Sequence, residues 1–174
     1  WTGIVFEAGS TGTISHAVLN NAGVAIVNYA AVDIDNVTIQ NGITGIDSNA
    51  NLNLSNSTLT DLAGTGILAR SGNLTLNMVT IQDCGGNAIA SGGTTGVVSI
   101  TNCDIDDVDG HGISFTHAAS SLTIGETTVD HASTALHLAS QTSTLIYNCA
   151  LRSSDIGIAI YGISGVDILD SVLD

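Results

Sequence analysis

The chain has 174 residues, of which 16 are acidic and only two, Arg70 and Arg152, are Lys or Arg, so its formal net charge is −14. Such a surface repels nucleic acid and anionic membranes, and we exclude nucleic-acid binding. No apolar run reaches the roughly 18 residues that a membrane span needs. The acidic, lysine-free composition favours an extracellular or cell-surface protein whose small partners are divalent cations.

A unit of 20 to 24 residues recurs eight times along the chain. Each unit begins with a small residue and an aliphatic residue, continues through a turn into an alternating strand, and ends with an Asn-type residue and another aliphatic. Repeats of this length without a helical run predict a solenoid, in which each unit buries its apolar face against its neighbours. We place the small residues at Gly3, Gly23, Gly45, Gly66, Ala88, Gly112, Ala135 and Gly157.

Three aliphatic positions recur within each unit and predict three columns of inward side chains. The first column follows the small residue and contains Ile4, Val24, Ile46, Ile67, Ile89, Ile113, Leu136 and Ile158. The second column lies in the next strand and contains Ile14, Ile34, Leu54, Leu76, Ile100, Ile124, Ile146 and Ile168. The third column comes five residues later and contains Leu19, Ile39, Leu59, Ile81, Ile105, Val129, Leu151 and Leu173. Three columns imply three sheet faces.

The spacing of five between the second and third columns breaks the period of two that a strand requires, so a corner must lie there. Most residues at this position are Asn or Asp, which tolerate left-handed backbone. The predicted corner residues are His16, Asn36, Asn56, Met78, Asn102, Glu126, Asn148 and Asp170.

Together these features predict an all-β fold: a right-handed, single-stranded parallel β-helix of about eight coils, forming one domain over residues 1–174. The segments Asn102-Cys103-Asp104-Ile105 and Asn148-Cys149-Ala150-Leu151 resemble the repeats of the pectin-lyase-like superfamily. That resemblance implies the fold but not the function, because this scaffold carries lyases, hydrolases, adhesins and structural proteins. We expect the three cysteines to be free thiols. We also expect the chain to be a segment of a longer or assembled solenoid that self-associates end to end.

The segment Gly110-His111-Gly112-Ile113-Ser114 resembles the Gly-His-Gly-Leu/Ile-Ser motif of the polygalacturonase family of glycoside hydrolases. In that family, the histidine lies beside carboxylates from the two preceding coils. Here the corresponding positions hold Gly86 and Asn87, and Gly64 and Thr65. An inverting glycosidase without these carboxylates can neither protonate the leaving group nor activate water. We therefore interpret the motif as a way to turn a corner.

Asp106, Asp130 and Arg152 fall in one outward column and should be neighbours about 4.8 Å apart. This arrangement resembles the pectate lyases, in which clustered aspartates hold calcium and an arginine acts as the base, and His111 is a further catalytic candidate. An ordinary surface charge ladder of little energetic value is the alternative interpretation.

The acidic turn offers a candidate calcium site. Asp104, Asp106, Asp107 and Asp109 lie within six residues, and carboxylate oxygens are the ligands that calcium prefers. The spacing is not that of an EF-hand, and a solvated acidic face is the alternative. The five histidines, which we expect to be solvated, are His16, His111, His117, His131 and His137.

The function that these features favour is a structural or surface module. We expect it to be extracellular and filament-forming, to need no cofactor, and to bind carbohydrate or cations weakly. Six aromatic residues among Phe, Trp and Tyr are too few to line a sugar-stacking groove. The alternative is a fragment of a polysaccharide lyase or glycoside hydrolase whose substrate groove follows one face of the solenoid.

Overall fold

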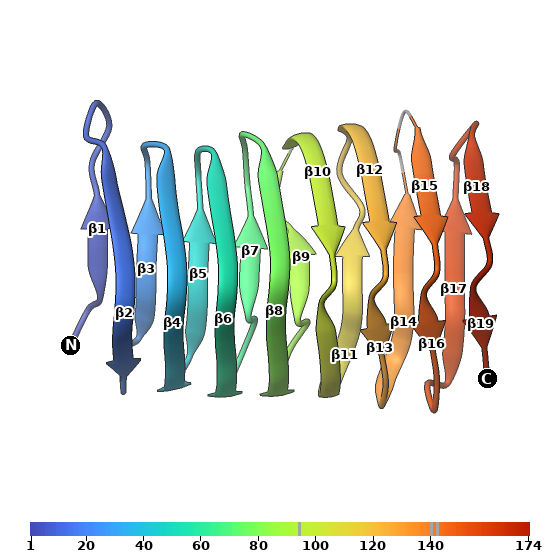
Figure 1. The fold of residues 1–174 in the computed structure, drawn as a ribbon, viewed down its shortest axis with the longest axis horizontal. Helices are drawn as coiled ribbons and strands as arrows, with labels where there is room; N and C mark the ends of the chain where they lie inside the picture. Colours follow the sequence, from blue (N-terminus) through green and yellow to red (C-terminus); the bar gives the residue numbers. More distant parts are fainter. Residues whose placement is uncertain (94, 140, 142) are drawn as a thin grey trace.

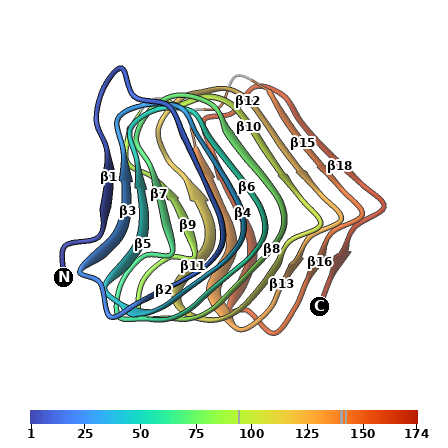
Figure 2. The ribbon, with the colours of Figure 1, turned by 60° about the vertical axis from the view of Figure 1, so that its left-hand side comes forward.

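A computed structural model describes residues 1–93, 95–139, 141 and 143–174. The regular secondary structure in this part of the chain consists of β-strands alone. All strand pairs are parallel, and each strand pairs with its equivalents in the neighbouring coils, the strands of the first and last coils on one side only. Figure 1 shows the strands side by side along the axis of the solenoid, with the two termini at opposite ends. Figure 2 shows each coil bending around a common interior.

Three faces enclose that interior, as the three columns predict. The first face consists of β1 (Ile4–Phe6), β3 (Val24–Asn28), β5 (Thr44–Ser48), β7 (Ile67–Ala69), β9 (Ile89–Ser91), the end of β11 (Asp104–Phe115), β14 (Ala132–Ala139) and β17 (Ile156–Tyr161). The second face consists of the first residues of β2 (Gly12–Asn20), β4 (Val32–Gly42), β6 (Leu52–Leu62) and β8 (Leu74–Cys84), with β10 (Thr95–Thr101), β12 (Ala119–Gly125), β15 (Thr144–Tyr147) and β18 (Val166–Leu169). The third face consists of the last residues of β2, β4, β6 and β8, the start of β11, and β13 (Thr128–Val129), β16 (Ala150–Leu151) and β19 (Val172–Leu173).

The strand register confirms the second and third columns at every coil. The first column is wrong at one place, because Ile26 and not Val24 pairs with Ile4 and with Ile46. The small buried residue of that coil is accordingly Ala25. Gly23 imitates the sequence pattern, but a Cβ added there would meet nothing within 4 Å, so no close approach requires a glycine.

All eight predicted corner residues have left-handed backbone, with φ between 49° and 55°. A second corner, which we did not predict, follows five residues later in seven coils, with φ between 46° and 58°. It is formed by Asn21, Asn41, Asp61, Asp83, Asp107, His131 and Ser153. Each of these seven coils therefore has two sharp bends, and the short third face lies between them.

The interior is a continuous aliphatic core whose largest fully buried side chain is Phe115. Cys84, Cys103 and Cys149 are free and buried in it, as expected. Burial raises the pKa of the Cys84 thiol to about 12 and that of Cys103 to about 11. These thiols are protonated at neutral pH and act as packing residues.

The inward columns are exposed at the last coil. Ile168 of the second column is 43% exposed and Leu173 of the third is 52% exposed, whereas their partners one coil earlier, Ile146 and Leu151, are buried. Among the described residues, no helix is long and apolar enough to cross a bilayer.

Candidate functional site

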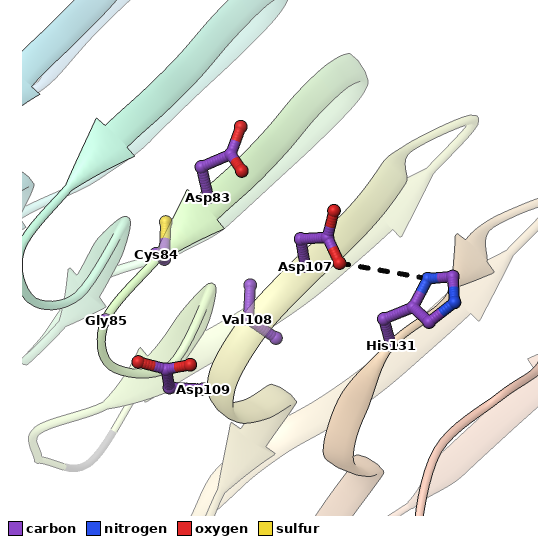
Figure 3. A pocket seen from close by; sticks show the side chains of 7 residues that line it. All are labelled: Asp83, Cys84, Gly85, Asp107, Val108, Asp109 and His131. Carbon is purple, nitrogen blue, oxygen red and sulfur yellow. Dashed lines mark ion pairs between the residues drawn. The ribbon is translucent and has the colours of Figure 1, made fainter.

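Among the described residues, three of the four ion pairs converge at the second corner, between two successive coils. We call Asp106, Asp107, Asp130 and His131 the acidic corner. The Nδ1 atom of His131 is 2.9 Å from Asp106 Oδ1, 3.5 Å from Asp130 Oδ1 and 3.9 Å from Asp107 Oδ1. Figure 3 shows the imidazole of His131 turned toward Asp107 across the gap between the coils.

The local backbone explains why these side chains meet. Asp107 and His131 are the corner residues of adjacent coils, with φ of 49° and 46°. The residue before each corner is an aspartate that accepts the backbone N–H of the corner residue: Asp106 Oδ1 from Asp107 and Asp130 Oδ1 from His131, both at 3.0 Å. Because the coils are in register, each Asp-corner pair lies directly beside the other.

The charge of His131 is set by these carboxylates. The hydrogen bond with Asp106 raises the pKa of His131, and the negative charges of Asp130, Asp106 and Asp107 raise it further. The side chains of His131 and Asp107 are 57% and 64% exposed, so solvent weakens the attraction between the imidazole and the carboxylates. A protonated imidazole would compensate part of the negative charge here.

The same groups can present ligand atoms to a cation. One ligand atom each from Asp106, Asp107 and His131 lie within 4.8 Å of one another. Beside them is an open hollow of about 350 Å³, and its rim includes Asp83 and Asp109 as well as Asp107 and His131. Figure 3 shows Asp83 and Asp109 in the hollow, on the far side of Asp107 from His131.

Some of the predicted calcium ligands therefore lie close together, and others do not. Asp106 and Asp107 belong to the acidic corner, and Asp109 lines the adjoining hollow. Asp104 lies on the third face, in register with Thr80 and Thr128, and is not in the group whose ligand atoms converge. His131 was expected to be solvated, and its place in this group was not predicted, although it lies 24 residues after Asp107 and so at the same position of the next repeat.

The backbone hydrogen bonds align the three residues of the predicted lyase column. Asp130 N–H donates to Ile105 O at 2.9 Å and Arg152 N–H to Val129 O at 2.9 Å, which places Asp106, Asp130 and Arg152 in successive coils. In the described part of the chain, Asp106 and Asp130 form ion pairs with His131, and the guanidinium of Arg152 forms none.

His111 belongs to a different cluster. Its ring lies against that of His137, with centroids 4.5 Å apart. Its backbone N–H donates to Asn87 Oδ1 at 2.8 Å, and the same oxygen would lie 2.5 Å from a Cβ added at Gly110. The first glycine of Gly110-His111-Gly112 thus makes room for a side chain of the preceding coil, as a packing role requires.

A ladder of polar side chains, separate from the acidic corner, runs along the second face near the N-terminus. Asp33 accepts a hydrogen bond from Asn53 at 2.6 Å, and Asp35 accepts from Ser55 at 2.7 Å and from Asn56 at 2.6 Å. The hydrogen bonds from Asn56 and then from Ser55 lower the pKa of Asp35. A hollow of about 450 Å³, which was not predicted from the sequence, lies over this ladder.

A family model described as "Right handed beta helix region" matches residues 1–129. No match to this chain was found among the curated proteins or among the solved structures. The family match agrees with the parallel coils of the structure and fixes their hand, so that both observations support one conclusion. The chain belongs to the right-handed β-helix family.

Proposed function

We propose that this chain is a structural module of an extracellular or cell-surface protein, with its faces available for weak contacts with carbohydrate or cations. The observation that carries the proposal is the unbroken ladder from β1 to β19, in which no described coil is expanded to wall a groove. Substrate grooves are normally walled by long loops. The acidic, hydroxyl-rich surface suits a location outside the cell.

We further propose that the chain self-associates end to end, and the open last coil supports this. Ile168 and Leu173 expose inward aliphatic side chains next to the unpaired backbone of β18 and β19. Such an edge is stabilised by another parallel coil. In a solution of the 174-residue chain, the first coil of a second copy can take that place, and repeated head-to-tail contacts of that kind would produce filaments.

Light scattering over a range of concentrations tests the assembly. We expect the mass to rise with concentration, and the double variant Ile168→Asp/Leu173→Asp to remain monomeric because the charges oppose burial of the coil. The control Val97→Asp, at an exposed position of β10, should assemble as the unchanged chain does. A concentration-independent monomer mass for the unchanged chain would contradict this part of the proposal.

The acidic corner is our proposed cation site. Asp106, Asp107 and Asp130 offer carboxylate oxygens to Ca²⁺, which would balance their negative charge. A cation that binds only the folded state raises the melting temperature by mass action.

Thermal melts in millimolar calcium and in excess chelator test this site. We expect calcium to raise the melting temperature of the unchanged chain and not that of Asp107→Asn. Asparagine tolerates the φ of 49° at this position, so the variant keeps the corner and loses only the charge. Equal melting temperatures with calcium and with chelator would contradict the proposed calcium site.

A further inference from the structure

Three aromatic rings from three successive coils meet on the first face. The imidazoles of His111, from β11, and His137, from β14, have centroids 4.5 Å apart and planes at 44°. The ring of Tyr161, from β17, lies edge-on to His137 with centroids 5.6 Å apart. The register neighbours of His137 are small: Ser114 on one side and Ala159 on the other. The rings therefore stand among small side chains.

Each imidazole is held by a serine of the other histidine's strand. His111 Nδ1 is 3.4 Å from Ser133 Oγ of β14, and His137 Nδ1 is 3.4 Å from Ser114 Oγ of β11. Ser114 is only 6% exposed, so its hydroxyl is held in place by the surrounding strands. Each of the two strands thus contributes one histidine and one serine to this pair of contacts. Because Nδ1 of each ring contacts a serine hydroxyl of the neighbouring strand, the fold sets the orientation of both rings.

The Nε2 atoms remain available. Among the described residues, neither Nε2 has a hydrogen-bond partner. When Nδ1 carries the proton and faces the serine oxygen, Nε2 presents a lone pair. Metal-binding histidines typically have this arrangement, with the other ring nitrogen donating to an oxygen of the protein.

The electrostatics favour a neutral ring at His111. Burial lowers the pKa of His111, and the neighbouring His137 lowers it further. Two adjacent imidazolium ions would repel each other, whereas a metal ion binds the neutral form of both.

We propose that His111 and His137 form a two-histidine site for a divalent transition-metal ion, bound through the two Nε2 atoms and completed by water. With Zn–N bonds of about 2.0–2.1 Å, one ion holds two nitrogens at most about 4.2 Å apart. Rings whose centroids are 4.5 Å apart allow that separation. Imidazole selects ions such as Zn²⁺ and Cu²⁺ over Ca²⁺ and Mg²⁺, so this site differs in chemistry from the acidic corner. It does not depend on the structural function proposed above.

Calorimetric titration with zinc chloride tests the site in the full chain. His131→Asn serves as the parent because it removes the imidazole of the acidic corner at a φ of 46° that asparagine tolerates. We expect the parent to bind Zn²⁺ and the further change His111→Asn or His137→Asn to weaken binding at least about tenfold. The matched control His117→Asn, whose ring contacts Ser91, should bind as the parent does. Equal affinity in the parent and in both further variants would overturn the proposal.

A second measurement on the parent needs no change at the site. Long-range ¹H–¹⁵N spectra of the histidine side chains should show Zn²⁺ shifting Nε2 of both His111 and His137, and a hundredfold excess of Ca²⁺ should not reverse the shift. Unshifted Nε2 signals under saturating Zn²⁺, or displacement by Ca²⁺, would overturn the proposal. So would shifts produced by oligosaccharides and not by Zn²⁺, since these would indicate a stacking platform for sugars.

Discussion

Single residues set the shape of each coil through left-handed backbone. Among the described residues, Asn and Asp fill 10 of the 15 non-glycine positions with positive φ, because their short polar side chains tolerate that conformation. The first corner could be predicted, since Asn recurs between two aliphatic columns. The second could not, because Asp107 and His131 there were equally consistent with a metal ligand and a solvated histidine. Composition alone does not separate a corner aspartate from a functional one.

Met78 is the corner residue least suited to its backbone. Its φ is 55°, its side chain is 52% exposed, and it adds no local hydrogen bond. We expect Met78→Asn to stabilise the fold by about 1 kcal/mol, because asparagine adopts left-handed backbone at lower cost. Denaturant unfolding should show this gain, with Met78→Leu as the control that leaves stability near its original value. If Met78→Asn were no more stable than Met78→Leu, strain at this corner would not be the reason.

Asp35 should make the fold sensitive to acid. Hydrogen bonds from Asn56 and then Ser55 lower the pKa of Asp35 below its ordinary value of 3.8, so its folded pKa lies below its unfolded pKa. Its contribution is present at neutral pH and is lost as the pH falls from above 3.8 through the lower folded value. Melts from pH 6 down to pH 2 should show a weaker acid dependence for Asp35→Asn, with Ser55→Ala intermediate. An unchanged acid dependence in Asp35→Asn would contradict this assignment.

The strands differ along the solenoid although the columns do not. β4, β6 and β8 each run for 11 residues through both corners, whereas the later coils are divided at the first corner into β12 and β13, β15 and β16, and β18 and β19 (Figure 1). The aliphatic columns could be predicted because the core imposes one register on every coil. The error at Val24 arose because Gly23 imitates a motif whose small residue is in fact Ala25.

Gly125 and Tyr147 show how one coil constrains the next. They are register partners in β12 and β15, and a Cβ added at Gly125 would collide with the Tyr147 ring. We expect Gly125→Ala to cost about 1–3 kcal/mol in the unchanged chain, as overpacking does. In a Tyr147→Ala background the same change should be neutral or stabilising, since alanine restricts the unfolded chain. A double-mutant cycle measures the difference, and equal effects in both backgrounds would show that the ring does not occupy this space.

At the scale of the whole molecule, the repeat explains the solenoid and says little about function. The fold was predictable because eight copies of one pattern average out local ambiguities. The sites were less so, since each depends on side chains from adjacent coils that lie more than 20 residues apart, such as Asp106 with His131 and His111 with His137. The sequence showed these residues singly, and only the register joined them.

The most direct test of a structural role is an assay for cleavage of pectate. The alternative function would require Asp106, Asp130 and Arg152 to bind calcium and abstract a proton, although Arg152 forms no ion pair in the described residues. We predict no release of unsaturated uronides from pectate by the purified chain, with or without calcium, and the same result for Arg152→Ala. Calcium-dependent release of unsaturated uronides that Arg152→Ala abolishes would contradict the structural role and establish the chain as a lyase.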